Sequence, residues 1–130
     1  MEAFTIEAAV DGGPGAAQRA RELVRRKLAG RISGGHLGDV VLLVTELVAN
    51  GVRHGGAVAG KPLHLRFVGA QRALRVEVAD PGGRANAVAR RDPDILKGGG
   101  LGLHIVDRVA SRTGVNDGPR TAVWFELDCR

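Results

Sequence analysis

Apolar residues recur every three or four positions through residues 36–56, the longest periodic stretch of the chain. This spacing predicts a central helix with one aliphatic stripe that faces a core. The stripe consists of Leu37, Val40, Val41, Val44, Leu47 and Val48. Glu46, Asn50 and His54 follow one another four residues apart, which places them along one side of the helix, roughly opposite the stripe. A solvated polar face is the ordinary interpretation of such a row, so the helix alone does not assign a function.

Shorter patterns predict the other elements of the chain. Alternation of apolar and polar residues predicts strands at Phe4–Ala8, Leu63–Val68, Leu74–Val78 and Ala122–Leu127. Helical spacing predicts further helices from Ala16 to about Ala29 and from Leu101 to about Arg112. Residues 79–100 are rich in glycine, proline and charge and have no period, which predicts a covering loop. Gly51 interrupts the central helix, which indicates either fraying or the close packing of a neighbour.

The order of these elements predicts a single domain over residues 1–130 with a two-layer α/β sandwich fold. We expect a mixed, mostly antiparallel sheet covered on one face by about three helices. The longest apolar run, Val40–Val44, is far shorter than a membrane span, and Met1–Val10 lacks the basic start of a signal peptide. A single cysteine, Cys129, excludes an internal disulfide. We therefore expect a cytoplasmic protein that does not bind a membrane.

The chain is basic, with 19 Lys and Arg against 14 Asp and Glu and a net charge of +5. Much of this charge lies in one segment, at Arg19, Arg21, Arg25, Arg26, Lys27 and Arg31. A basic chain can bind nucleic acid. However, the chain has no Tyr, three Phe and one Trp, so it has few side chains that could stack on bases. A solvated helix face is the first interpretation of the segment, an acidic protein partner or a bound nucleotide the second, and DNA the third.

Strand parity indicates two polar side chains that point toward the core. Asp80 shares the parity of Leu74, Val76 and Val78, and Thr121 shares that of Val123, Phe125 and Leu127. A buried carboxylate needs hydrogen-bond donors, so Asp80 and Thr121 could together hold the amino group of a ligand. The alternative is that Asp80 only caps the turn at residues 81–83.

Two further features suit the phosphates of a nucleotide. The segment Gly98-Gly99-Gly100-Leu101-Gly102 leads into a predicted helix, where bare backbone N–H groups can bind an anion. It is neither the GxxxxGK[ST] phosphate loop nor the GxGxxG fingerprint, and such a cluster is often only a hinge. The side-chain oxygen of Asn50 suits Mg²⁺, and Glu46 one turn away could position or deprotonate an attacking hydroxyl.

Three motifs occur in a fixed order: ELVANGVRH at Glu46–His54, DPGG at Asp80–Gly83 and GGGLGLHIV at Gly98–Val106. In this order and spacing, and with TAVWFEL at Thr121–Leu127, the chain resembles the GHKL ATPase superfamily over most of its length. The combination is much more specific than any one glycine pattern. The resemblance implies the Bergerat ATP-binding fold, with ATP and Mg²⁺ as cofactors.

The resemblance also implies a role for each matching residue. The residues implied to bind ATP are Asn50, Asp80, Gly82, Gly98, Gly100, Leu101, Gly102 and Thr121. Asn50 would ligate Mg²⁺, and Glu46 would be the general base. Asp80 would accept a hydrogen bond from the amino group of adenine, with support from Thr121. Arg84 stands where many relatives keep a glycine, so lid opening or packing at the adenine edge is expected to differ.

A domain of this length with the motif ELVANGVRHG looks like the anti-sigma-factor serine kinases of bacteria. The resemblance implies that the chain binds a sigma factor, phosphorylates a serine of a STAS-domain anti-anti-sigma protein and regulates transcription, and homodimers are common among such relatives. Charge and position alone suggest that Arg90, Arg91 or Lys97 could assist the transfer. For His54 we expect only a role in capping or buttressing the helix end. Two other functions stay open: a non-catalytic, ATP-gated protein-binding module, and a nucleic-acid binder without an ATP site.

Overall fold

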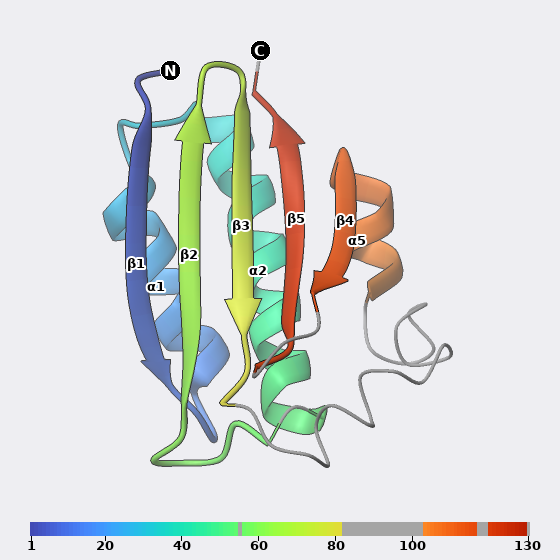
Figure 1. The fold of residues 1–130 in the computed structure, drawn as a ribbon. Coiled ribbons are helices and arrows are strands. Elements are labelled where there is room, and N and C mark those ends of the chain that lie inside the picture. Colours follow the sequence, from blue (N-terminus) through green and yellow to red (C-terminus); the bar gives the residue numbers. More distant parts are fainter. Residues whose placement is uncertain (55, 82–102, 117–119, 130) are drawn as a thin grey trace.

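The computed structural model describes residues 1–54, 56–81, 103–116 and 120–129. The described elements are, in order, β1 (Phe4–Asp11), α1 (Ala16–Leu28), α2 (Gly34–His54), β2 (Pro62–Ala70), β3 (Ala73–Ala79), α5 (Leu103–Val109), β4 (Arg112–Asn116) and β5 (Ala122–Asp128). The strands form one sheet of order β1-β2-β3-β5-β4, in which all neighbours pair antiparallel. The three described helices lie on one face of this sheet (Figure 1). The predicted two-layer sandwich is confirmed.

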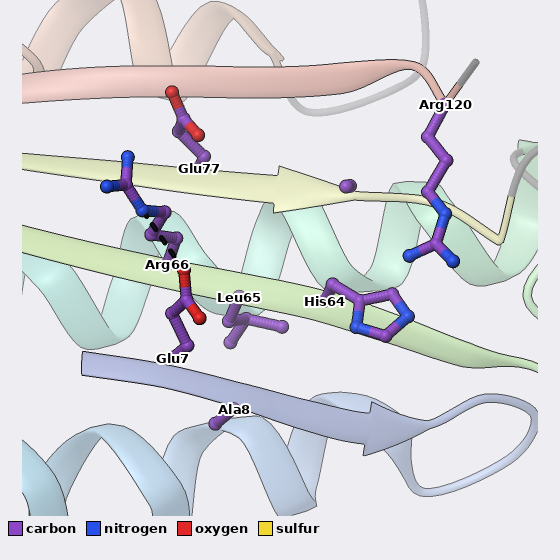
Figure 2. Close-up of a pocket in the computed structure, with 8 residues that line it drawn as sticks. Glu7, Ala8, His64, Leu65, Arg66, Glu77 and Arg120 are labelled. Carbon is purple, nitrogen blue, oxygen red and sulfur yellow. Dashed lines mark ion pairs between the residues drawn. The ribbon is translucent and has the colours of Figure 1, made fainter.

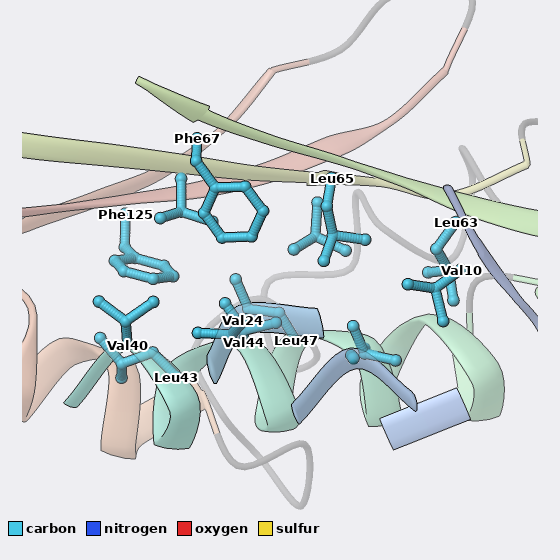
Figure 3. Packing of buried hydrophobic residues seen from close by; sticks show 14 of the residues in the cluster. Val10, Val24, Val40, Leu43, Val44, Leu47, Leu63, Leu65, Phe67 and Phe125 are labelled. Carbon is cyan, nitrogen blue, oxygen red and sulfur yellow. The ribbon is translucent and has the colours of Figure 1, made fainter. Parts of the chain in front are cut away.

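The core lies between the sheet and α2. Leu65, Phe67 and Phe125 point from the sheet toward Leu43 and Val44 of α2 (Figure 3). All five are essentially excluded from solvent. Burying side chains of this size contributes roughly 1.5–3 kcal/mol each. Their positions follow from the two periods in the sequence, because alternate strand residues and every third or fourth helix residue share a face.

Helix α2 is the central element of the helical layer. By length and hydropathy alone it is also a candidate membrane span. In the fold it is instead the core helix, since it packs against α1, β3 and α5. Its buried residues are Val40, Leu43, Val44, Leu47, Val48, Asn50 and Gly51.

The edge strand β4 was not predicted. The sequence pattern extended the preceding helix to about Arg112, but α5 ends at Val109 and β4 begins at Arg112. This segment has one aliphatic residue, Val115, so it shows no alternation of apolar and polar residues that would predict a strand. It forms a strand because β5 offers a free edge, and because Arg112 donates to Asp128 at 2.7 Å and to Glu126 at 3.1 Å. These two carboxylates, Asp128 first, raise the pKa of the Arg112 guanidinium.

Candidate functional site

Helix α2 carries Asn50 on its buried side. Asn50 is 0% exposed, although the sequence pattern placed it roughly opposite the aliphatic stripe. The predicted exposure of this side of the helix is wrong because α2 is contacted by α1 and α5 in addition to the sheet. The buried surface of the helix is therefore wider than one stripe. Glu46 and His54, which share the row with Asn50, are half-buried.

The amide of Asn50 makes only some of the hydrogen bonds that it could. Its Oδ1 accepts a hydrogen bond from Arg53 Nη2 at 3.2 Å. Its Nδ2 is equally buried and has no hydrogen-bond partner among the residues that the structure describes. Leaving a buried donor unpaired costs about 1–3 kcal/mol. An amide kept at such a cost is a candidate for ligand binding.

The turn of α2 that carries Asn50 is held closely against the sheet. A Cβ added at Gly51 would lie 2.4 Å from Leu63 Cδ2 of β2, and Leu63 is completely buried. Of the two interpretations of Gly51, the close packing of a neighbour is thus the correct one. After the helix ends, Ala57 N donates to Gly51 O at 3.1 Å, which fixes the departing chain. Glycine at this position lets the helix end approach β2.

Asp80 and Thr121 lie where strand parity predicted them. Asp80 is 1% and Thr121 4% exposed, so their inward orientation is confirmed. The two residues extend the pairing of β3 with β5 by one step beyond Ala79 and Ala122, and Asp80 N donates to Thr121 O at 3.1 Å. The backbone therefore places a buried carboxylate beside a buried hydroxyl. Their roles toward a ligand stay predictions.

These side chains come from three elements that meet at one end of the molecule. Figure 1 shows the end of β3, the start of β5 and the C-terminal half of α2 at the same end of the two-layer fold. Asn50, Asp80 and Thr121 are the three buried polar or charged residues among the described ones. The other predicted site residues, Gly82, Gly98, Gly100, Leu101 and Gly102, lie outside the described residues, as do Arg84, Arg90, Arg91 and Lys97.

The described part of this site offers a specific set of chemical groups. The Asp80 carboxylate can accept from an amino group, and the Thr121 hydroxyl can donate or accept beside it. The Asn50 oxygen is a hard ligand of the type that suits Mg²⁺, which binds through few protein groups together with phosphates. Residues 1–54, 56–81, 103–116 and 120–129 contain no group of three His, Cys, Asp or Glu side chains that could hold a metal by themselves. The residues present therefore fit a nucleotide that brings its own phosphate ligands to the cation.

Sequence reasoning missed the contact of Arg53 with Asn50. The helical period places Arg53 on the polar side of α2, beside the row of Glu46, Asn50 and His54. Its spacing of three residues from Asn50 is one at which helical side chains meet, so the signal was present in the sequence. The contact was not predicted because the helical pattern assigned Asn50 to an exposed face.

A separate hollow lies on the outer face of the sheet, away from the helices. It has a volume of about 460 Å³, and its lining includes Glu7, Arg66, Glu77 and Arg120 (Figure 2). Arg66 pairs with Glu7 at 3.3 Å. The predicted site residues that the structure describes, Glu46, Asn50, Asp80 and Thr121, do not line this hollow. It is therefore distinct from the site around Asn50 and Asp80.

The model of the family described as the histidine kinase-like ATPase domain matches residues 10–127. The chain belongs to this family. The resemblance to the GHKL superfamily is thereby confirmed, and the domain is an ATP-binding domain of the kinase or ATPase type. Strands β2, β3 and β4 lie wholly within the matched range, which also covers all of β5 except its last residue, Asp128.

A solved structure shows the same fold. It is the crystal structure of the RsbU and RsbW domains of Rv1364c from Mycobacterium tuberculosis, which is 20% identical to this chain with a TM-score of 0.68. The match covers 96% of this chain and 32% of the other. The histidine kinase-like domain thus spans about a third of that structure's chain. A search of the curated proteins gave no match.

Proposed function

We propose that this histidine kinase-like domain is an ATP-dependent serine/threonine protein kinase of the anti-sigma-factor type, acting in the cytoplasm. It would bind a sigma factor and transfer the γ-phosphoryl group of ATP to a serine of a STAS-domain antagonist, and so regulate transcription. Membership of the family supports ATP binding. The likeness to a structure that contains an RsbW domain supports the choice of this branch over other kinases and ATPases.

The observation that carries the proposal is the buried pair of Asp80 and Thr121. The Asp80 carboxylate is 1% exposed, and burying a charged group costs free energy unless hydrogen-bond donors surround it. An adenine amino group supplies a donor for that carboxylate, whereas guanine presents a carbonyl oxygen at the same ring position. The pair therefore favours ATP over GTP.

Glu46 is the residue proposed to act on the protein substrate. The serine Oγ would form a bond to the γ-phosphorus while the bond from that phosphorus to the bridging β–γ oxygen breaks, which releases ADP. The hydroxyl proton would pass to the Glu46 carboxylate. Glu46 is half-buried on α2, one turn before Asn50, so it remains accessible to a docked partner.

Asn50 is the residue proposed to hold the Mg²⁺ that accompanies ATP. When bound, the cation would offset the negative charge of the phosphates during transfer. Asn50 contributes a neutral oxygen on a rigid, buried turn of helix, which adds no charge that would repel the triphosphate.

The basic surface of α1 supports a protein partner that carries acidic groups. Arg25, Arg26 and Lys27 in the last turn of α1 are exposed. Arg19, which belongs to the same segment, is instead engaged by its own loop, because its Nη2 donates to Asp11 O at 2.9 Å and to Gly12 O at 3.1 Å. Long-range attraction between opposite charges mainly speeds association, so binding of the partner should weaken with salt.

Calorimetry tests the nucleotide site. The parent should bind MgATP and not MgGTP. Asp80→Asn should weaken ATP binding by at least about tenfold, because a neutral amide oxygen is a weaker acceptor for the adenine amino group than a carboxylate oxygen. Asp39→Asn is the matched control, since Asp39 lies near the other end of α2 and should bind ATP as the parent does. If the heats of ATP binding were equal and negligible in the parent and in Asp80→Asn, the remaining function would be that of a nucleic-acid binder without an ATP site.

Phosphotransfer separates the kinase from the second candidate, a non-catalytic module that uses ATP to capture a partner. The protein is incubated with γ-labelled ATP and each STAS-domain protein encoded in the same genome. Label should reach one of them, and Glu46→Gln should bind ATP normally but transfer at least about a hundredfold more slowly. ATP-dependent capture of a partner with no label transferred would establish the module instead.

A further inference from the structure

Arg53 is the only described residue that hydrogen-bonds the side chain of Asn50. It sits in the last turn of α2, three residues after Asn50, and it is an exposed residue. Its guanidinium carries donors only, so the atom of the amide that faces it must be the oxygen. The 3.2 Å contact to Oδ1 therefore defines which way the buried amide is turned.

The same oxygen is the only side-chain atom of Asn50 that could ligate a cation, because the amide nitrogen carries two hydrogens and has no free lone pair for a metal. A guanidinium and a divalent cation on one neutral oxygen would repel each other. At a separation of about 4 Å, charges of this kind interact by several kcal/mol even at the moderate dielectric of a protein surface. Binding of a cation at Oδ1 therefore requires that Arg53 withdraw.

We propose that Arg53 is a positioning residue that competes with Mg²⁺ for the Asn50 oxygen and so sets how strongly nucleotide binding depends on the cation. This inference rests on the proposed function of the site. In the nucleotide-free protein the guanidinium occupies Oδ1, the atom that would hold the cation, and keeps this oxygen turned toward Arg53. When MgATP binds, the exposed side chain of Arg53 moves away while the backbone of α2 stays in place.

The measurement is the affinity for ATP in excess MgCl₂ and in excess EDTA, by calorimetry on the full chain. The ratio of the two affinities reports the coupling between nucleotide and cation. It cancels any contact of Arg53 with the nucleotide that is the same in both conditions. Arg53→Met keeps the aliphatic stem and loses the donors and the charge. In this variant the ratio should rise about threefold to tenfold, the range for the loss of one ordinary hydrogen bond, because the guanidinium is exposed to solvent.

Three further variants identify the cause. Arg72→Met removes the same charge from the exposed turn between β2 and β3, at the end of the sheet remote from the end of α2 (Figure 1), and should leave the ratio unchanged. Arg53→Gln keeps a neutral donor and should give an intermediate ratio. In Asn50→Ala the ratio should approach one, and adding Arg53→Met should not alter it. Urea unfolding of each variant checks that it is folded.

The outcomes separate this inference from the proposed function. A parent that binds ATP more tightly with Mg²⁺, together with an Arg53→Met ratio equal to that of Arg72→Met, would overturn the competition and leave the kinase proposal standing. A ratio that falls in Arg53→Met would also overturn it, since Arg53 would then support the cation. A parent that binds no ATP in either condition would remove both.

Discussion

Two glycines of α2 should respond in opposite ways to the same substitution. Gly38 is exposed, and a Cβ added there would meet no atom within 4 Å. Replacing a helical glycine by alanine stabilises a helix by about 0.8–1 kcal/mol when nothing else changes. Gly38→Ala should therefore raise the free energy of unfolding by about this amount.

Gly51→Ala has the same gain in helix propensity but adds a methyl group 2.4 Å from Leu63 Cδ2. Leu63 is 0% exposed, so its methyl group has no empty space into which it can turn. Overpacking of this kind costs about 1–3 kcal/mol. After subtraction of the propensity gain, Gly51→Ala should destabilise the protein by about 1 kcal/mol.

A double-mutant cycle identifies the cause of that loss. Leu63→Val removes the clashing methyl group, because the next atom of Leu63, Cγ, lies 3.7 Å from the added Cβ, an ordinary contact. In the Leu63→Val background, Gly51→Ala should stabilise by about 0.5–1 kcal/mol, which gives a coupling of roughly 2 kcal/mol between the sites. Urea unfolding followed by circular dichroism measures all the variants. If Gly51→Ala stabilised the parent as much as Gly38→Ala does, the close approach of α2 to β2 would be wrong.

Three further predictions concern other parts of the chain. Asn50→Leu should leave the free energy of unfolding unchanged or raise it by up to about 1 kcal/mol, because it removes a buried donor that has no partner among the described residues. ATP binding should be lost. A decrease of more than about 2 kcal/mol in the free energy of unfolding would instead assign Asn50 a structural role. A Cβ at Gly114 would lie 2.6 Å from Trp124 Cζ2. Gly114→Ala should therefore displace the indole of Trp124, the single Trp of the chain, and shift its fluorescence to longer wavelength. Unchanged emission would contradict this packing. Burial raises the pKa of the Cys129 thiol, so its alkylation by iodoacetamide should have a pH midpoint above that of an unfolded thiol. The contribution of the protonated thiol to the free energy of unfolding is complete below the pKa of the unfolded thiol and is lost as the pH rises through the folded value. Cys129→Ser should remove this loss. An equal decline of the free energy of unfolding in both proteins would show that Cys129 is not its cause.

The sequence by itself determined the parts of the structure that depend on a local period. Alternation along two strands placed Asp80 and Thr121 on the inner face of the sheet, because side chains of a strand alternate between its faces whatever the strand packs against. The helical period located α1 and α2, and the order of the three motifs indicated the family that the match over residues 10–127 confirms.

Tertiary structure decided what depends on neighbours distant in sequence. Asn50 is buried because α1, α5 and the sheet surround α2, and a single helix pattern cannot show how many sides a helix has covered. β4 forms because β5 offers a free edge to a segment with little pattern of its own. The choice of glycine at position 51 follows in the same way from packing, since it depends on which atoms α2 meets once the layers are assembled. The contact of Arg53 with Asn50 is local to α2, and what the tertiary structure adds is the burial of the amide that Arg53 contacts.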